Sequence, residues 1–129
     1  TRFDVSTKSS MQLVNEAVFE ALQDAEFTFK DINAVVVGNL DFRNNGERQK
    51  HMASMLSSLF KTNMPIIRVP AACAGGGAAL WAANRVGEEF GNVLVIGGNK
   101  AYTCNNIVTH LFLPSAVHRD GFPPVRVIT

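Results

Sequence analysis

The sequence predicts a layered α/β domain with a mostly parallel central sheet. Three short runs rich in β-branched residues alternate with segments whose apolar residues recur at helical spacing. The first run shows no polar–apolar alternation, which is typical of a strand covered on both faces. The order helix, strand, helix, strand, helix, strand favours parallel strands joined by right-handed crossovers. The runs are Ala34–Val37, Ile66–Val69 and Val93–Ile96.

Length and composition favour one globular domain, residues 1–129. With 129 residues, 47% of them apolar and 18% charged, the chain can bury a core of ordinary size. A formal net charge of +1, with basic residues spread along the chain, argues against a nucleic-acid partner or an anionic membrane surface. The longest apolar stretch, residues 71–83, is too short and too rich in glycine and alanine to span a bilayer. We therefore expect neither a membrane span nor nucleic-acid binding.

The cysteine content favours a reducing compartment. Cys73 and Cys104 lie far apart in the sequence and form neither a disulfide framework nor a metal-ligand spacing. An intracellular location is therefore expected. The chain starts at Thr1 without a methionine, and we expect it to be a piece of a longer polypeptide.

The first predicted elements are a helix and a buried strand. A helix is expected over residues 10–25, because Ser9–Gln12 has the Ser-x-x-Gln form of a capping box and apolar residues then recur at helical spacing. A connector over residues 26–33 follows. The run Ala34–Val37, closed by Gly38-Asn39, is expected to be a strand in the interior of the sheet.

A polar loop over residues 41–47 leads to a second amphipathic helix. Its apolar positions are Met52, Met55, Leu56, Leu59 and Phe60. Asn63 and Pro65 should stop this helix. The second strand, Ile66–Val69, should end at Pro70, which supplies no donor to the sheet.

The third helix is the most apolar part of the chain. Residues 71–83 are small or apolar, and no charge appears before Arg85. A helix that is apolar on all sides belongs in the interior of a domain. Gly87–Gly91 should end it, and Val93–Ile96 should form the third buried strand. In the tail, only Val125–Ile128 has a strand-like composition.

Cys73 is the candidate catalytic residue. It lies between Pro70 and Gly75-Gly76-Gly77, which predicts a sharp strand-to-helix turn. At the start of a helix, unpaired N–H groups and the helix dipole favour the thiolate, the nucleophilic form of cysteine. The glycines would let a substrate approach the sulfur closely. The alternative is that Cys73 is a small buried hydrophobic residue.

The segment Ala71–Ala79 resembles the nucleophile motif of the thiolase superfamily, in which a cysteine among alanines and glycines opens a buried central helix. The resemblance is to the N-terminal half of sterol-carrier-protein-type and archaeal-type enzymes. The segments that follow their order and approximate spacing are Glu16–Ala25, Asp31–Asn39, Ile66–Ala83 and Val93–Gly98. This implies a thiolase-like half whose buried central helix starts at Cys73.

The resemblance implies an acyl-CoA C-acyltransferase. The Cys73 thiolate would attack an acyl-CoA thioester and pass the acyl group to a second acyl-CoA or back to CoA, in Claisen condensation or thiolysis. The backbone N–H of Cys73 would donate to the thioester oxyanion. A coenzyme A thioester is then the substrate, and no bound cofactor or metal is expected. Thiolases pair through the edge strand near the nucleophile, which implies a homodimer, located in the cytoplasm or, in a eukaryotic cell, in the peroxisome or mitochondrion.

The sequence departs from the family where thiolases complete their site from the C-terminal half. His51, His110 and His118 lack the neighbours of the family's histidine motifs, and Cys104 is not followed by x-Gly. The resemblance therefore implies that this chain alone cannot perform the full reaction.

Three smaller differences concern the helix end and the tail. Glu26 stands where a helix-ending glycine is expected, and Asn99-Lys100-Ala101 replaces an acidic residue and methionine. Residues 103–129 match no part of the family and stay unassigned.

Two other functions remain open. A non-catalytic thiolase-like domain that binds acyl-CoA or a lipid is one, because only one catalytic residue can be named. A dinucleotide-binding turn that begins with Gly75-x-Gly77 is less favoured, because Leu80 occupies the third small position and residues 70–74 separate the glycines from the strand.

Two further sets of residues have ordinary explanations. His110, His118 and Cys104 lack any standard metal-ligand spacing, so no metal site is predicted. Their positions are typical of loop or surface residues. A basic set could meet CoA phosphates, although a solvated helix face explains it as well. This set is Arg43, Arg48 and Lys50.

Overall fold

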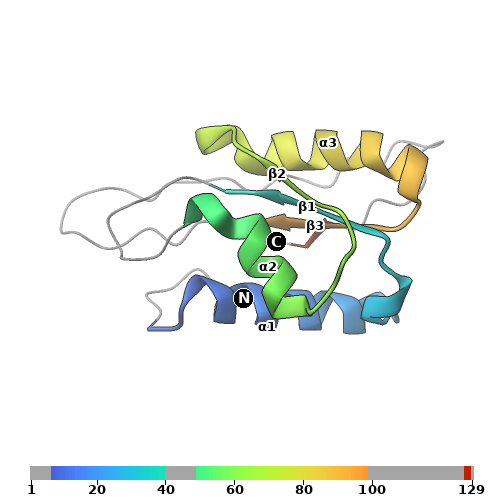
Figure 1. Cartoon of the computed structure of the whole chain (residues 1–129), viewed down its shortest axis with the longest axis horizontal. Helices are drawn as coiled ribbons and strands as arrows, with labels where there is room; N and C mark the ends of the chain where they lie inside the picture. The colour runs from blue at the N-terminus through green and yellow to red at the C-terminus, as the bar shows by residue number, and fades with distance from the viewer. Residues whose placement is uncertain (1–6, 40–48, 99–126, 129) are drawn as a thin grey trace.

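The computed structural model describes residues 7–39, 49–98 and 127–128 and arranges them in three layers. Figure 1 shows helices α1 (Ser10–Asp24) and α2 (Met52–Phe60) on one face of the sheet and helix α3 (Gly75–Phe90) on the other. This arrangement confirms the predicted α/β class. None of the helices in the described part is long and apolar enough to cross a membrane.

The sheet is parallel throughout, with strand order β2-β1-β3-β4. Its strands are β1 (Ala34–Gly38), β2 (Ile66–Val69), β3 (Val93–Gly97) and β4 (Val127–Ile128). β1 lies between β2 and β3, and every one of its residues is buried. The three predicted runs are confirmed as strands; β1 and β3 are largely buried, whereas β2 is only half-buried. The strand-like end of the tail contributes a short fourth strand.

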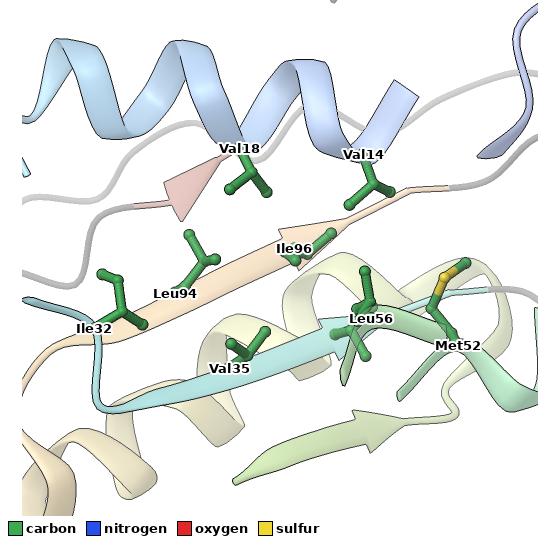
Figure 2. Close-up of a cluster of buried hydrophobic side chains, with 9 residues drawn as sticks. Val14, Val18, Ile32, Val35, Met52, Leu56, Leu94 and Ile96 are labelled. Carbon is green, nitrogen blue, oxygen red and sulfur yellow. The ribbon is translucent and has the colours of Figure 1, made fainter. Parts of the chain in front are cut away.

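The two faces of the sheet bury alternate residues of β1 and β3, as the period of a strand requires. Figure 2 shows the first core, in which Val14 and Val18 of α1 and Leu56 of α2 pack against strand residues such as Val35. The second core lies under α3 and consists of Ala34, Val36, Ala79, Ala83, Val93 and Val95. Because both faces are covered, the strands need apolar residues at consecutive positions.

Helix α1 begins where its capping box predicts. The Ser9 hydroxyl accepts a hydrogen bond from the Gln12 N–H at 3.2 Å, and the Gln12 side chain accepts one from the Ser9 N–H at 2.8 Å. These two bonds satisfy donors that the first turn of a helix otherwise leaves unpaired. The helix ends at Asp24, within one residue of the prediction.

The connector between α1 and β1 contains a short 3₁₀ helix that the sequence analysis did not predict. It spans Phe29–Asp31, and the Thr28 N–H and hydroxyl both donate to the Asp31 carboxylate at 2.7 Å. The sequence signal was present as Thr28-x-x-Asp31, a capping-box spacing with aspartate in the last position.

Helix α3 differs from the prediction of a helix buried on all sides. It buries only the face that contains Gly75, Ala79 and Ala83, and the side chain of Trp81 is 68% exposed. Small residues allow a helix to approach a sheet closely on one face, so their abundance need not mean burial on every face. The predicted buried central helix is therefore wrong for the described residues.

Candidate active site

Cys73 lies in the connection between β2 and α3 and is exposed. It is the middle residue of a 3₁₀ turn, Ala72–Ala74, and α3 begins at Gly75. α3 therefore begins two residues later than the predicted start at Cys73. The alternative that Cys73 is a small buried hydrophobic residue is also wrong, because Cys73 is exposed.

The turn that carries Cys73 is formed by local backbone geometry. Ala72 adopts a left-handed conformation with φ of 45°, which costs an alanine about 1 kcal/mol. The Ala74 N–H donates to the carbonyl of Ala71 at 2.9 Å, and the Gly75 N–H donates to the carbonyl of Ala72. These bonds satisfy two backbone donors at the start of α3 and close the turn between β2 and α3.

The start of α3 rests directly on the backbone of β1. A Cβ atom on Gly38 would lie 2.1 Å from the carbonyl oxygen of Gly75, so no larger residue fits there without movement. A Cβ atom on Gly75 would lie 3.5 Å from the Asn39 nitrogen. These contacts place the Cys73 turn above the edge where β1, β2 and β3 all end.

The approach to the start of α3 is open as far as the described residues extend. A Cβ atom on Gly76, Gly77 or Gly98 would meet nothing within 4 Å. The N-cap residue of α3, Ala74, makes no side-chain capping hydrogen bond. The carboxyl ends of parallel strands and the start of the following helix are where ligands bind in many α/β folds. Cys73 itself is exposed, so its side chain is accessible to solvent among the described residues.

Two polar side chains beside this edge were not singled out from the sequence. The Nε–H of Arg68 donates to the Oδ1 atom of Asn39 at 2.7 Å, and Asn39 is only 1% exposed. The available signals were an arginine inside an otherwise apolar strand and an asparagine directly after a buried one. Neither signal shows that the two side chains meet, because their strands are separated by a helix in sequence.

The remaining sequence candidates do not join Cys73 in the described part. His51 is exposed at the start of α2, and Lys50 is exposed in the 3₁₀ turn Gln49–His51. The residues that lie outside the described ranges are Arg43, Arg48, Cys104, His110 and His118. Among residues 7–39, 49–98 and 127–128, no cluster of histidine, cysteine or acidic side chains is arranged to hold a metal ion.

The glycines of the dinucleotide alternative lie in the first turn of α3. The 3₁₀ turn Ala72–Ala74 separates Gly75 and Gly77 from the end of β2, whereas a dinucleotide-binding turn follows its strand directly. Leu80 is half-buried. The structure therefore differs from a dinucleotide-binding turn in the same two respects as the sequence does.

Comparison with known families, characterised proteins and solved structures found no match for this chain. The functional argument therefore depends on the residues around Cys73 and on the geometry of the turn that carries it.

Proposed function

We propose that this chain is the nucleophile-bearing part of a thiolase-like acyl-CoA C-acyltransferase and that Cys73 accepts the acyl group. The observation that carries the proposal is the position of an exposed thiol in a strand-to-helix turn, immediately ahead of the start of α3. Nucleophiles in α/β proteins are typically presented on such turns, where nearby backbone N–H groups can stabilise an anion.

The proposed step is a thioester exchange. The Cys73 thiolate attacks the carbonyl carbon of an acyl-CoA, the tetrahedral oxyanion collapses, and the bond between that carbon and the CoA sulfur breaks. The CoA thiolate leaves with the electron pair of the broken bond and takes up a proton from water. The products are S-acyl-Cys73 and free CoA. This first half-reaction needs one nucleophile, whereas completing condensation or thiolysis requires proton-transfer groups from elsewhere.

Acyl transfer is tested by intact-mass analysis of the chain after incubation with acetyl-CoA at neutral pH. We expect the mass to increase by one acetyl group, with peptide mapping that places the group on Cys73. Cys73→Ala should lose the modification, and the matched control Cys104→Ala should keep it. If both single variants were acetylated to the same extent, the nucleophile assignment would be overturned.

Alkylation separates this proposal from the two alternative functions. Iodoacetamide at neutral pH should label Cys73 much faster than Cys104, and acetyl-CoA should suppress the labelling of Cys73. Suppression without any acyl transfer would favour a non-catalytic acyl-CoA-binding domain. Suppression by NADH but not by acetyl-CoA would favour the dinucleotide-binding domain.

We also propose that two copies of the chain pair through β2, in an intracellular compartment that keeps Cys73 reduced. In the described sheet β2 is an edge strand, and its residue Ile67 is 39% exposed. An edge strand presents unpaired backbone groups to a second chain, and an exposed isoleucine adds apolar surface. The pairing would place two Cys73 turns close to one interface.

A further inference from the structure

We infer that Asn39 is a positioning residue for Cys73, because it contacts the chain on both sides of the turn over residues 70–74. The inference rests on the proposed acyl transfer for its kinetic consequence. Its structural content, that Asn39 keeps this turn in place, can be tested without any substrate.

The side chain of Asn39 contacts the chain ahead of the turn. Its Oδ1 atom accepts the 2.7 Å hydrogen bond from the Nε–H of Arg68. Arg68 pairs with Val37 in the parallel register of β2 and β1, so its side chain reaches forward along the sheet to Asn39. A hydrogen bond to a charged group stabilises a fold more than a bond between neutral groups does.

The backbone of Asn39 contacts the chain behind the turn. The Asn39 nitrogen lies 3.5 Å from where a Cβ of Gly75 would be, and a Cβ on the neighbouring Gly38 would lie 2.1 Å from the Gly75 carbonyl oxygen. One buried residue therefore accepts a hydrogen bond from β2 through its amide oxygen, and its main chain lies close to the first residue of α3. Cys73 lies between these two contacts.

Loosening either contact should let the turn shift relative to the start of α3. Acyl transfer needs the sulfur, the carbonyl carbon and an oxyanion donor in line, and a displacement of about 1 Å can reduce a rate about a hundredfold. A residue that only stabilises the fold would not have this selective effect on the turn.

The experiment compares four variants of the full chain with the unsubstituted protein. Asn39→Ala removes the acceptor of Arg68, and Arg68→Met removes the donor while keeping an aliphatic stem. Asn39→Asp keeps an oxygen acceptor for Arg68 and is the conservative rescue. Asn33→Ala is the matched control, because Asn33 lies just before β1 and its Oδ1 accepts a hydrogen bond from the Asn92 N–H at 3.3 Å, at the opposite end of the sheet.

Two measurements are made on each variant. One is the single-turnover rate of Cys73 acetylation by acetyl-CoA. The other is hydrogen exchange of the Ala74 amide, whose bond to Ala71 reports whether the turn is formed. We expect Asn39→Ala and Arg68→Met to slow acetylation at least about tenfold and to speed Ala74 exchange, while Asn39→Asp and Asn33→Ala stay within about threefold of the unsubstituted chain.

The inference is overturned if Asn39→Ala acetylates at the unsubstituted rate with unchanged Ala74 exchange. It is equally overturned if Asn33→Ala slows acetylation as much, because the loss would then follow general stability. Absence of acetylation in the unsubstituted chain would instead contradict the proposed function, and the exchange of Ala74 would still decide whether Asn39 holds the turn.

Discussion

Single residues in the left-handed region mark where the chain turns at a local energetic cost. Among the described residues, non-glycine residues with positive φ are Glu26 at 55°, Lys61 at 49° and Ala72 at 45°. Glu26 ends α1 with two backbone hydrogen bonds, from Glu26 N–H to the Gln23 carbonyl and from Phe27 N–H to the Leu22 carbonyl. This bonding pattern normally has glycine at the left-handed position. The glycine that the family resemblance leads one to expect at Glu26 thus has a structural reason.

Glu26→Gly should increase the free energy of unfolding by about 1 kcal/mol, because glycine adopts the left-handed conformation without steric cost. Urea denaturation followed by circular dichroism measures the change. Glu20→Gly is the matched control, since Glu20 is exposed inside α1 and a glycine there should lower the stability by about 1 kcal/mol. A decrease in stability for both variants would contradict the role of Glu26.

Among the described glycines, Gly38 has the least room for a side chain. Gly38→Ala should destabilise the fold by about 3 kcal/mol, because the new methyl group would overlap the Gly75 carbonyl and force α3 away from the sheet. Gly97→Ala is the control, because its Cβ would lie 3.9 Å from the Gly76 Cα, at an ordinary contact distance. Thermal denaturation should show a large loss for the first variant and little change for the second; similar melting temperatures would argue against the close contact.

At the scale of elements, the short 3₁₀ helix Phe29–Asp31 gives the fold a dependence on pH. The Thr28 hydroxyl, and then the Thr28 backbone N–H, donate hydrogen bonds to the Asp31 carboxylate and hold the pKa of Asp31 below its ordinary value. The bonds favour the ionised form in the folded state. Their contribution to stability is therefore present above the unfolded-state pKa, about 3.9, and is lost as the pH falls through the lower folded-state pKa.

The Asp31 carboxyl should accordingly titrate below the ordinary value when followed by NMR in the folded chain. The difference in unfolding free energy between the unsubstituted chain and Asp31→Asn should stay constant from about pH 7 to pH 5 and shrink below about pH 4. Lys30 lies in the same turn, and Lys30→Gln is the control variant. Its difference in unfolding free energy from the unsubstituted chain should not change with the titration of Asp31. A difference for Asp31→Asn that grows as the pH falls would contradict the sign.

At the scale of the whole molecule, the strand order leaves β2 at an edge of the described sheet. α3 packs over β1 and β3, whereas Ile67 of β2 is left partly uncovered. An exposed apolar edge strand favours association with another chain. The same strand leads directly into the Cys73 turn, so association at β2 would bear on the candidate active site.

Light scattering should therefore give twice the chain mass of 14.0 kDa for the unsubstituted protein. Ile67→Lys should shift the chain toward the monomer, because a charge on the outer strand opposes pairing. The matched control is Phe19→Lys, since Phe19 is a 72% exposed apolar residue on α1, away from the sheet edge. A monomer for the unsubstituted protein, or loss of the dimer in the Phe19 variant alone, would contradict pairing through β2.

Sequence reasoning succeeded where the structural cause is local. The capping box of α1, the apolar face of α2 and the unalternated run of β1 each depend on neighbouring residues, and the structure confirms all three. The same reasoning placed Cys73 in a strand-to-helix turn, because Pro70 must interrupt the strand and a helical segment follows within a few residues. The 3₁₀ helix Phe29–Asp31 was missed although its capping spacing was visible, since short turns leave no apolar period.

By itself the sequence determined the α/β class, the order of the elements and the turn that holds Cys73, because hydrophobic periodicity, capping and proline act over a few residues. Only the tertiary structure decided that α3 buries one face, that Gly38 lies against Gly75, and that Arg68 meets Asn39. These contacts join segments distant in sequence, and small residues suit both all-round burial and close packing on a sheet. The residue types alone cannot distinguish a helix buried on all sides from one that packs closely on a sheet with a single face. The packing of α3 on β1 shows that the second arrangement is present.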